Sequence, residues 1–598
     1  MRFKSKLLVL LIIAGLLSSI KIGCSSKPVD QKQVLTESTE GKFKPGTYTA
    51  EAQGRNGIIK VSVTVDDNSI KEVKILEHSE SAGIADAAIE KIPLRVVEGQ
   101  TLAIDAIAGS TITSNAILLA VEDALKQAGA DIEALKNKRE EIVTGDVITY
   151  DTEIVVVGAG GAGLSAALEA ANQGAKVILV EKLAMTGGST ARSGGKILAA
   201  GTDIQKANGI EDNADLYYEF LVQIGEGKIN EKKARIIADT SLVNFNWLVE
   251  NGVEFSKNIE ALHPTRKPAR GHYVAVQDGK VEQDGHGWAI TQPLEKKARE
   301  AGVEILLETP AKRLITDSTG AVVGVECENV KGQKVIINAK AVILATGGYD
   351  KNPELLKEYA PLIEPVYATV PEGNVGDGLI MAREVGAKIE AHGGAILLYL
   401  DLSAGVGEVG GLYVDSTGSR FMNETDFWFT RTRILLERQQ KIMYYITDAK
   451  GKLDNFDGLV EAGRIFKADT IEELQQELGM TELVKTVERY NTLAKKGVDE
   501  DFNKSPEYLM PVDEGPFYAI PFVQITSGTF GGPLTNEKAQ VISTNGDIIK
   551  GLYAAGEVAN GDVFYKEYPG SGSSISMCIA FGRIAGREAA QEIIMSRK

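Results

Sequence analysis

The most constraining feature of this 598-residue chain is a glycine fingerprint that directly follows an apolar run. The run Glu153–Val157 predicts a buried strand, Gly158-Ala-Gly-Gly-Ala-Gly163 follows it, and Leu164–Gln173 has the pattern of a helix. A second apolar run, Lys176–Val180, ends at Glu181, which completes a β-α-β unit. Such glycines permit a tight turn and close approach of the backbone to a pyrophosphate, and the acid can hold ribose hydroxyls. The sequence therefore predicts a Rossmann-like α/β domain that binds a dinucleotide.

Three further glycine-rich turns favour FAD over a dissociating nicotinamide cofactor. Thr186–Gly195 lies just after Glu181, Ala341–Gly348 ends a buried strand in a Gly-Gly turn, and Gly551–Glu557 ends another near the C-terminus. Small residues from several distant segments that contact one cofactor suit a long, enclosed ligand such as FAD. The alternative is that these segments are ordinary tight loops of an α/β sheet. The residues predicted to hold non-covalent FAD are Gly158, Gly160, Gly161, Ala162, Gly163, Glu181, Lys182, Thr186, Gly187, Gly188, Ser189, Thr190, Ser193, Gly194, Gly195, Thr346, Gly347, Gly348, Asp377, Gly556, Glu557, Ser573, Ser574 and Ile575.

Length and charge narrow the class of protein. A chain of 598 residues exceeds what one core supports, so two or more domains are expected. The net charge of -17 argues against nucleic acid as a partner, because phosphate binding needs a basic face. The five histidines lack metal-ligand spacing and no Cys-x-x-Cys-His occurs, so we expect neither a metal site nor c-type haem.

The first residues have the pattern of an export signal. Three basic residues among the first six precede the apolar run Leu7–Leu17, which is shorter than the roughly 20 residues of a membrane span. Ile22-Gly-Cys24 then resembles a bacterial lipoprotein cleavage site, which predicts removal of residues 1–23 and lipidation of Cys24. A plain secretory peptide and an uncleaved anchor are the alternatives. We therefore expect an extracytoplasmic protein that a lipid anchors to the cell membrane.

A small domain is expected ahead of the fingerprint. Alternating runs at Ile58–Val65 and Ile70–Ile75 predict strands, and Asn115–Ala128 has helical periodicity. Together they predict an α+β module. The expected boundaries are a linker at 24–42, the small domain at 43–135 and a second linker at 136–150.

From residue 151 onward the chain resembles the flavoprotein family of fumarate reductases, urocanate reductases and 3-ketosteroid dehydrogenases. The matching segments, in the family's order, are the fingerprint, Ala345-Thr-Gly-Gly348, Val375-Gly-Asp-Gly-Leu379, Gly418-Ser-Arg-Phe-Met-Asn-Glu424, Thr529-Phe-Gly-Gly532 and Ala554-Ala-Gly-Glu557. The resemblance implies a Rossmann-like FAD domain in two parts, 151–392 and 523–598. An inserted α+β capping domain at 393–522 would interrupt it, with the active site in the cleft between them.

Residues 43–130 resemble the FMN-binding module of bacterial electron-transfer proteins. In that module a threonine hydroxyl carries FMN through a phosphoester, at the end of an Asp-x-x-Ser/Thr-Gly-Ala-Thr motif. The matching segment is Asp105-Ala-Ile-Ala-Gly-Ser-Thr111, which departs from the motif at Ala108 and Ser110. The resemblance implies covalent FMN on Thr111, attached by a flavin transferase, with Thr113 as the less favoured acceptor. The alternative is a Ser/Thr-rich turn that caps the next helix.

The resemblance also implies a reaction. Reduced FAD would transfer hydride to an activated C=C bond, and an arginine of the capping domain would donate the proton. In fumarate reductases this arginine follows an Arg-Phe-x-Asn-Glu segment, here Arg420–Glu424, so Arg431 is the predicted donor and Arg433 the alternate. Glu408 would pass protons to Arg431. The alternative is that both arginines lie on a solvated, charged helix face.

Departures from the family's pattern bear on the substrate. Three polar positions that serve a second carboxylate in fumarate reductases correspond here to His392-Gly-Gly, Ser527-Gly528 and Tyr568-Pro-Gly-Ser-Gly572. A buried carboxylate without partners is costly, so fumarate is not the expected substrate. Tyr568–Gly572 is instead similar to a segment of 3-ketosteroid dehydrogenases, which implies that the Tyr568 hydroxyl and the Gly572 N–H polarise a substrate carbonyl.

These expectations combine into one function. The chain is predicted to be an exported reductase of an α,β-unsaturated carboxylate, urocanate-like or cinnamate-like, that serves anaerobic respiration. Electrons would pass from a membrane-associated donor to FMN, then to FAD and to the small-molecule substrate. A 3-ketosteroid-type dehydrogenase and a non-catalytic flavin electron carrier remain the alternatives.

Overall fold

The computed structural model of the protein describes residues 42–80, 85–107, 110–137, 147–260, 267–275, 287–363, 366–401, 410–440 and 442–597. The predicted signal segment, Cys24 and Glu408 lie outside these ranges. None of the helices in the described ranges combines the length and the apolar character that crossing a membrane requires.

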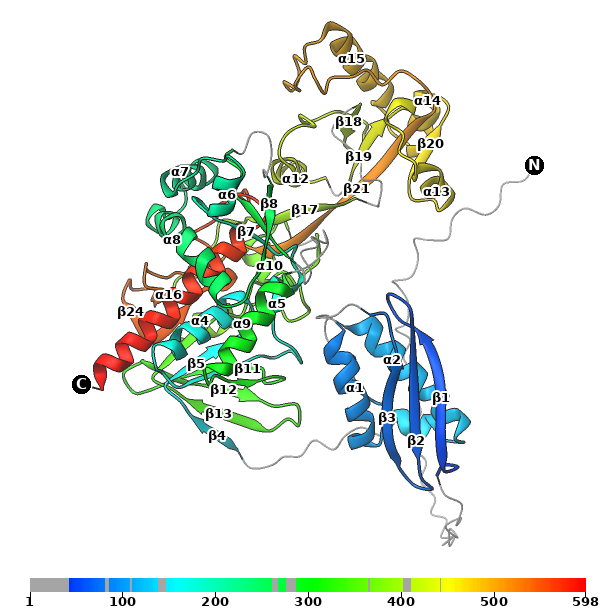
Figure 1. The fold of residues 1–598 in the computed structure, drawn as a ribbon. Coiled ribbons are helices and arrows are strands. Elements are labelled where there is room, and N and C mark those ends of the chain that lie inside the picture. Colours follow the sequence, from blue (N-terminus) through cyan, green and yellow to red (C-terminus); the bar gives the residue numbers. More distant parts are fainter. Residues whose placement is uncertain are drawn as a thin grey trace, which may run out of the picture.

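The N-terminal elements form a small α+β unit, coloured blue in Figure 1. Three antiparallel strands lie in the order β1-β2-β3, and helices pack on one face of this sheet. The strand β2 alternates between buried and more exposed side chains because only that face is covered. The elements are β1 (Gly46–Gln53), β2 (Ile58–Val65), β3 (Ile70–Glu77), α1 (Asp86–Gly99), α2 (Thr111–Gln127) and α3 (Ile132–Asn137). The predicted strands and helix are confirmed, and α2 begins four residues before the expected Asn115.

A six-stranded sheet forms the centre of the larger unit. Its order is β10-β6-β5-β14-β24-β23, and all neighbours are parallel except β23 and β24. The strands β5, β6 and β14 are buried along their whole length, which explains their unbroken apolar sequences. The bounds are β5 (Ile154–Val157), β6 (Val177–Val180), β10 (Glu304–Leu306), β14 (Ala341–Leu344), β23 (Gln540–Ile542) and β24 (Ile548–Ala554).

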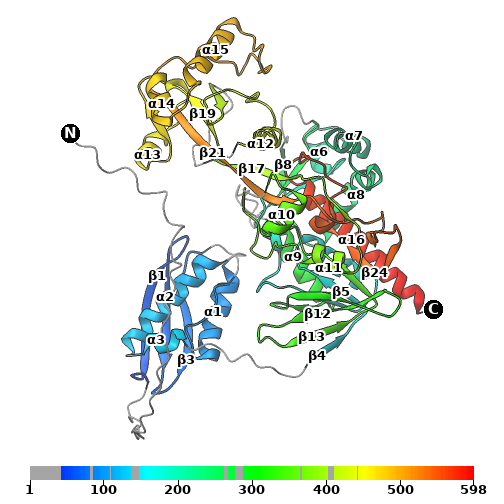
Figure 2. The ribbon, with the colours of Figure 1, turned by 180° about the vertical axis from the view of Figure 1, so that it is seen from behind.

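This sheet is the middle of three layers. One face is covered by the helices α4 (Gly161–Asn172), α9 (Trp288–Glu300) and α16 (Ser573–Ser596). The other face is covered by a mixed sheet in the order β11-β12-β13-β4, in which β4 is parallel to β13 and the other neighbours are antiparallel (Figures 1 and 2). Its strands are β4 (Ile148–Asp151), β11 (Ala311–Thr316), β12 (Val322–Glu328) and β13 (Lys334–Asn338). The confirmed fold class is therefore α/β, with a nucleotide-binding sheet that is buried on both faces.

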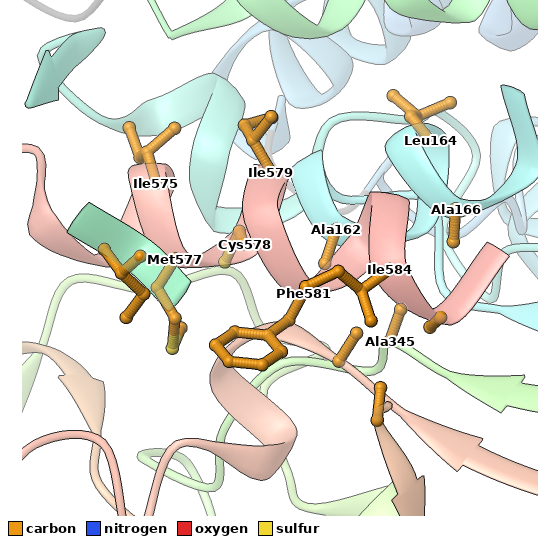
Figure 3. Close-up of a cluster of buried hydrophobic side chains, with 14 of the residues drawn as sticks. Ala162, Leu164, Ala166, Ala345, Ile575, Met577, Cys578, Ile579, Phe581 and Ile584 are labelled. Atoms are coloured by element: carbon orange, nitrogen blue, oxygen red, sulfur yellow. The ribbon is translucent and has the colours of Figure 1, made fainter. Parts of the chain in front are cut away.

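The helices α4 and α16 approach each other closely because glycines occupy the contact. An ideal Cβ on Gly582 would lie 2.4 Å from the carbonyl oxygen of Ala162, and one on Gly586 would lie 2.2 Å from that of Ala166. Figure 3 shows the apolar side chains around this crossing, among them Ile579 and Phe581 of α16. The first turn of α4, which belongs to the fingerprint, is thus held in place by the C-terminal helix.

Replacing Gly582 with valine should lower the free energy of unfolding by about 1–3 kcal/mol, because overpacking forces backbone shifts. The denaturant midpoint of the FAD-loaded protein measures this effect. Gly458 is the matched control, since it lies in the helix α13 (Phe456–Glu461), and beyond its chain neighbours and the backbone of that helix no heavy atom of the described residues lies within 4 Å of an added Cβ. An equal loss in the Gly458→Val protein would contradict the packing explanation.

A second unit, hereafter the cap, comprises the elements from β18 to α15, residues 411–496, and is drawn at the top of Figure 1. The 13-residue strand β21 (Phe517–Thr529) pairs with β19 and β20 of the cap in its first half. Its second half pairs with β17 (Ala395–Asp401) and β15 (Tyr367–Ala368). The cap elements are β18 (Gly411–Val414), α12 (Trp428–Glu437), β19 (Ile442–Thr447), α13, β20 (Phe466–Ala468), α14 (Ile471–Leu478) and α15 (Leu483–Lys496).

The remaining elements surround the central sheet. They are α5 (Gly188–Arg192), β7 (Lys196–Leu198), α6 (Asp203–Ala207), α7 (Ala214–Ile224), α8 (Glu231–Glu250), β8 (Phe255–Glu260), β9 (Gly271–Val274), α10 (Pro353–Tyr359), α11 (Asp377–Glu384), β16 (Ile389–Glu390) and β22 (Gly532–Pro533). The strands β7, β9 and β8 form a separate antiparallel sheet.

Candidate functional site

A pocket opens at the carboxyl ends of the parallel strands β5, β6, β14 and β24, where α/β folds bind their ligands. The predicted FAD residues that line it are Gly158, Gly160, Gly161, Ala162, Glu181, Lys182, Gly188, Ser189, Thr190, Thr346, Gly347, Asp377 and Glu557. The predicted residues that do not line it are Gly163, Thr186, Gly187, Ser193, Gly194, Gly195, Gly348, Gly556, Ser573, Ser574 and Ile575. Segments from four distant parts of the sequence therefore converge on one pocket.

Two glycines of the fingerprint stand where the backbone leaves no room for a side chain. Gly158 has a φ of 103°, and a Cβ there would lie 2.4 Å from the carbonyl oxygen of Ala345. A Cβ on Gly163 would lie 1.8 Å from the carbonyl oxygen of Gly158. The buried hydroxyl of Thr346 lines the pocket and has no hydrogen-bond partner among the described residues. A polar ligand would satisfy it, so the pocket fits a dinucleotide.

Two acids fix the walls of the pocket. Glu181 accepts the N–H groups of Ala159 at 2.8 Å and Leu183 at 2.9 Å, which ties the fingerprint to the end of β6. Burial raises the pKa of Glu181. Asp377, the first residue of α11, pairs with Lys182 across the pocket. Residues 195 positions apart in sequence are thus joined at the ligand site.

A buried pair of carboxyl groups, Asp350 and Glu557, lies at the pocket, and the sequence analysis names Glu557 but not Asp350. The Nδ2 of Asn374 donates to Asp350 at 2.9 Å and to Glu557 at 3.4 Å. Thr529 donates its backbone N–H to Glu557 at 3.0 Å and its hydroxyl to Asp350 at 3.2 Å. Burial raises the pKa of Asp350 to about 6 and that of Glu557, which Asp350 also opposes, to about 8. No short motif predicts this arrangement, since the two acids and their partners Asn374 and Thr529 come from four separate segments.

The carboxyl pair predicts a pH dependence of stability in the apoprotein. Acids whose pKa values are raised in the folded state bind more protons when the protein is folded. Their contribution to the free energy of unfolding is therefore complete below their pKa values in the unfolded chain, and it is lost as pH rises through the folded-state values. The denaturant midpoint should therefore fall between about pH 4 and about pH 8. Glu557→Gln should flatten this fall at its upper end. An unchanged slope in that variant would contradict the raised pKa of Glu557.

Tyr568 lies in an aromatic cluster between the FAD domain and the cap. Its ring centroid is 4.8 Å from that of Phe429 on α12, and Phe530 and Phe564 pack around it. The hydroxyl accepts the N–H of Ser574 at 2.8 Å, so its own hydrogen can be donated to another oxygen. Gly572, which precedes α16, has a φ of 101° and would place a Cβ 2.8 Å from the carbonyl oxygen of Lys196.

The two candidate arginines point to different sides of α12, because residues two apart on a helix lie roughly 200° from each other. Arg431 is only 2% exposed, donates to the carbonyl oxygen of Glu424 at 2.6 Å, and lies over the ring of Tyr413. Arg433 is partly exposed and pairs with Glu567 at 3.3 Å and Glu437 at 3.1 Å. The alternative that both arginines lie on a solvated helix face is thus wrong for Arg431.

Of the two candidate acceptors of FMN, only Thr111 lies at the surface. Thr111 is the first residue of α2 and is exposed. Thr113 is buried, and its hydroxyl donates to the carboxylate of Glu80. A hydroxyl that must accept a phosphoester needs access, so Thr111 is the better placed residue. Ala108 and Gly109 of the motif lie outside the described residues.

The pocket at the carboxyl ends of the strands, with its glycine-rich turns and the buried Thr346 hydroxyl, is typical of a nucleotide-binding flavoprotein. The family model of the FAD-binding domain matches residues 153–575, and that of the FMN-binding domain matches residues 54–126. The chain therefore belongs to the FAD-binding family, carries an FMN-binding domain in addition, and is an FAD-dependent oxidoreductase. FAD and FMN are its cofactors.

Several known proteins are similar to this chain. Urocanate reductase of Eggerthella lenta is 32% identical over 97% of both chains. The solved 3-ketosteroid-Δ4-(5α)-dehydrogenase of Rhodococcus jostii RHA1 is 28% identical, with a TM-score of 0.65 over 76% of this chain and 99% of that one. The open conformation of a flavocytochrome c3 fumarate reductase is 30% identical, with a TM-score of 0.60 over 74% of this chain and 78% of that one.

Proposed function

We propose that this oxidoreductase reduces the C=C bond of an α,β-unsaturated carboxylate, of the urocanate or cinnamate type. The observation that carries the proposal is the similarity to a urocanate reductase along 97% of both chains, which includes the FMN-binding domain and the cap. The aromatic cluster around Tyr568 and Phe429 fits a planar, conjugated substrate better than a small dicarboxylate.

Bound FAD supplies the electron pair for such a reduction. The Tyr568 hydroxyl, oriented by Ser574, would donate a hydrogen bond to the substrate carbonyl, with the N–H of Gly572 beside it. Arg431 would supply the proton from the cap, where burial keeps water away from the transfer. For this it must exchange its bond to the Glu424 carbonyl for a contact with substrate.

An unsatisfied donor near this cluster supports a substrate with a further acceptor. The Nε1 of Trp428 is buried and has no hydrogen-bond partner among the described residues, and its ring lies 6.1 Å from that of Phe429. A buried N–H without a partner is costly, so an acceptor on the bound ligand would relieve it. The imidazole nitrogen of a urocanate-like acid provides such an acceptor.

We further propose the route by which electrons reach the site. FMN would be attached covalently to Thr111 by a flavin transferase, and a membrane-associated donor would reduce it before electrons pass to FAD. An apolar N-terminus that ends in Cys24 supports lipid anchoring outside the cytoplasm. The presence of an FMN-binding and an FAD-binding domain in one chain supports the internal transfer.

The test is a panel of unsaturated compounds offered to the dithionite-reduced holoprotein, read as flavin reoxidation. Urocanate or cinnamate should reoxidise the flavin at least about tenfold faster than fumarate, the factor that one differential contact of about 1.4 kcal/mol provides. Reoxidation by fumarate alone, or by none of the panel above the buffer rate, would overturn the proposal.

A 3-ketosteroid-type dehydrogenase is the second candidate. The hydrogen-bonded Tyr568 and the similarity to the Rhodococcus jostii enzyme favour it. It would run in the oxidative direction, so a saturated 3-ketosteroid should bleach the oxidised flavin. Bleaching without reoxidation by any enoate would decide for this alternative.

A further inference from the structure

The FMN-binding domain contacts the FAD domain through helix α1. Lys91 donates to the backbone carbonyl of Ala184 at 2.6 Å and pairs with Glu308 at 3.3 Å. Arg95, one turn further along α1, pairs with the other oxygen of the same carboxylate. All three charged side chains are partly buried. Ala184 and Met185 pack against the hydrophobic core of the FMN-binding domain.

The segment that receives α1 is also a wall of the FAD pocket. Lys182, Leu183 and Gly188 line the pocket, whereas the intervening Ala184 and Met185 face the FMN-binding domain. Glu308 belongs to the same wall, because its N–H donates to the carbonyl of Leu183 at 3.0 Å and its neighbour Thr309 lines the pocket. A single layer of backbone therefore separates the two flavin-binding units at this contact.

Positive charge accumulates on both sides of the interface. Burial lowers the pKa of Arg192 in α5, the carboxylate of Glu372 opposes this shift, and the charge of Arg55, in the turn between β1 and β2, adds to it. Lys91 and Arg95 add two more cations, and both pair with the carboxylate of Glu308. Loss of that carboxylate would leave Lys91 and Arg95 without the negative charge that they face across the contact.

From this contact we propose that Lys91, Arg95 and Glu308 form an ionic latch that docks the FMN-binding domain in the arrangement in which electrons pass from FMN to FAD. The inference rests on the electron route proposed above and adds its docking site. Partly exposed ion pairs are individually weak and are screened by salt, so the latch is reversible. Release would free the FMN-binding domain to meet its reductant.

Charge reversal tests the latch with the FAD- and FMN-loaded protein. Glu308→Lys alone, and Lys91→Glu with Arg95→Glu, should each increase the radius of gyration in small-angle X-ray scattering. Each should also slow electron relaxation between the flavins after flash photoreduction by at least about tenfold, because undocking lowers their effective concentration. The triple variant restores opposite charges and should recover both properties, as coupled residues do in a double-mutant cycle.

The controls keep the result specific. Lys42→Glu with Lys44→Glu makes the same charge change at two exposed positions of the same domain and should behave as the parent. Equal FAD content shows that each variant folds. Raising the ionic strength to about 1 M, where the screening length is about 3 Å, should slow relaxation in the parent as well.

The outcome that overturns the latch is parental compactness and relaxation in Glu308→Lys, or a triple variant that recovers neither. Both readouts are made without substrate. A failure to reduce any unsaturated carboxylate would therefore refute the proposed function while leaving these measurements unchanged.

Discussion

Replacing Arg431 with glutamine is expected to lower turnover with the preferred enoate by about 10²- to 10⁴-fold, the range over which a positioned proton donor acts. Arg431 is buried on the cap, away from bulk water that might replace its proton. The FAD content should not change, since Arg431 does not line the FAD pocket. Steady-state rates normalised to bound FAD measure the effect.

Arg433→Gln is the matched control on the same helix. Arg433 is already paired with Glu437 and Glu567 and is partly exposed, so its loss should change turnover much less. If the Arg433 variant loses turnover while the Arg431 variant keeps normal turnover, the proton donor lies on the other side of α12.

Thr111→Val is expected to remove covalently bound FMN entirely. Valine keeps the shape of threonine but lacks the hydroxyl that would carry the phosphoester. After acid denaturation the parent should retain FMN fluorescence on the polypeptide and release FAD, whereas the variant should release FAD alone. Turnover driven through FMN should be lost with it, while reduction of FAD by dithionite should persist.

Thr113→Val separates attachment from local structure. The Thr113 hydroxyl bonds the buried Glu80 and Thr111 is exposed, so this variant should keep covalent FMN at some cost in stability. Covalent flavin that survives in the Thr111 variant but disappears in the Thr113 variant would exchange the two roles.

Much of the fold could be predicted because its signals are local. The alternation in Ile58–Val65 and the apolar run before Gly158 reflect how many faces of each strand are covered, and both strands occur as expected. The sequence predicts a helix only from Asn115, because the preceding Thr111-Ile-Thr-Ser114 is rich in residues with weak helix propensity, whereas α2 begins at Thr111. The first turn is instead held by the buried Thr113, which bonds Glu80, and Ser114, which accepts the N–H of Ile107.

What could not be predicted depends on contacts between distant segments. The pairing of Asp350 with Glu557 and the close crossing at Gly582 have no signature within any short window. The helical period separates Arg431 from Arg433, but it does not tell which of the two faces the interior. Only the packing of α12 between the cap and Tyr568 settles that question.

The long strand β21 has a consequence for measurement. Its first half belongs to the cap sheet, whereas its last residue, Thr529, is bonded to the two acids at the FAD pocket. Any molecule that shifts the cap on binding must pull on those acids. We expect this displacement to change the visible absorption band of bound FAD. Titration with unreactive substrate analogues should then measure their affinity by absorbance, without any turnover.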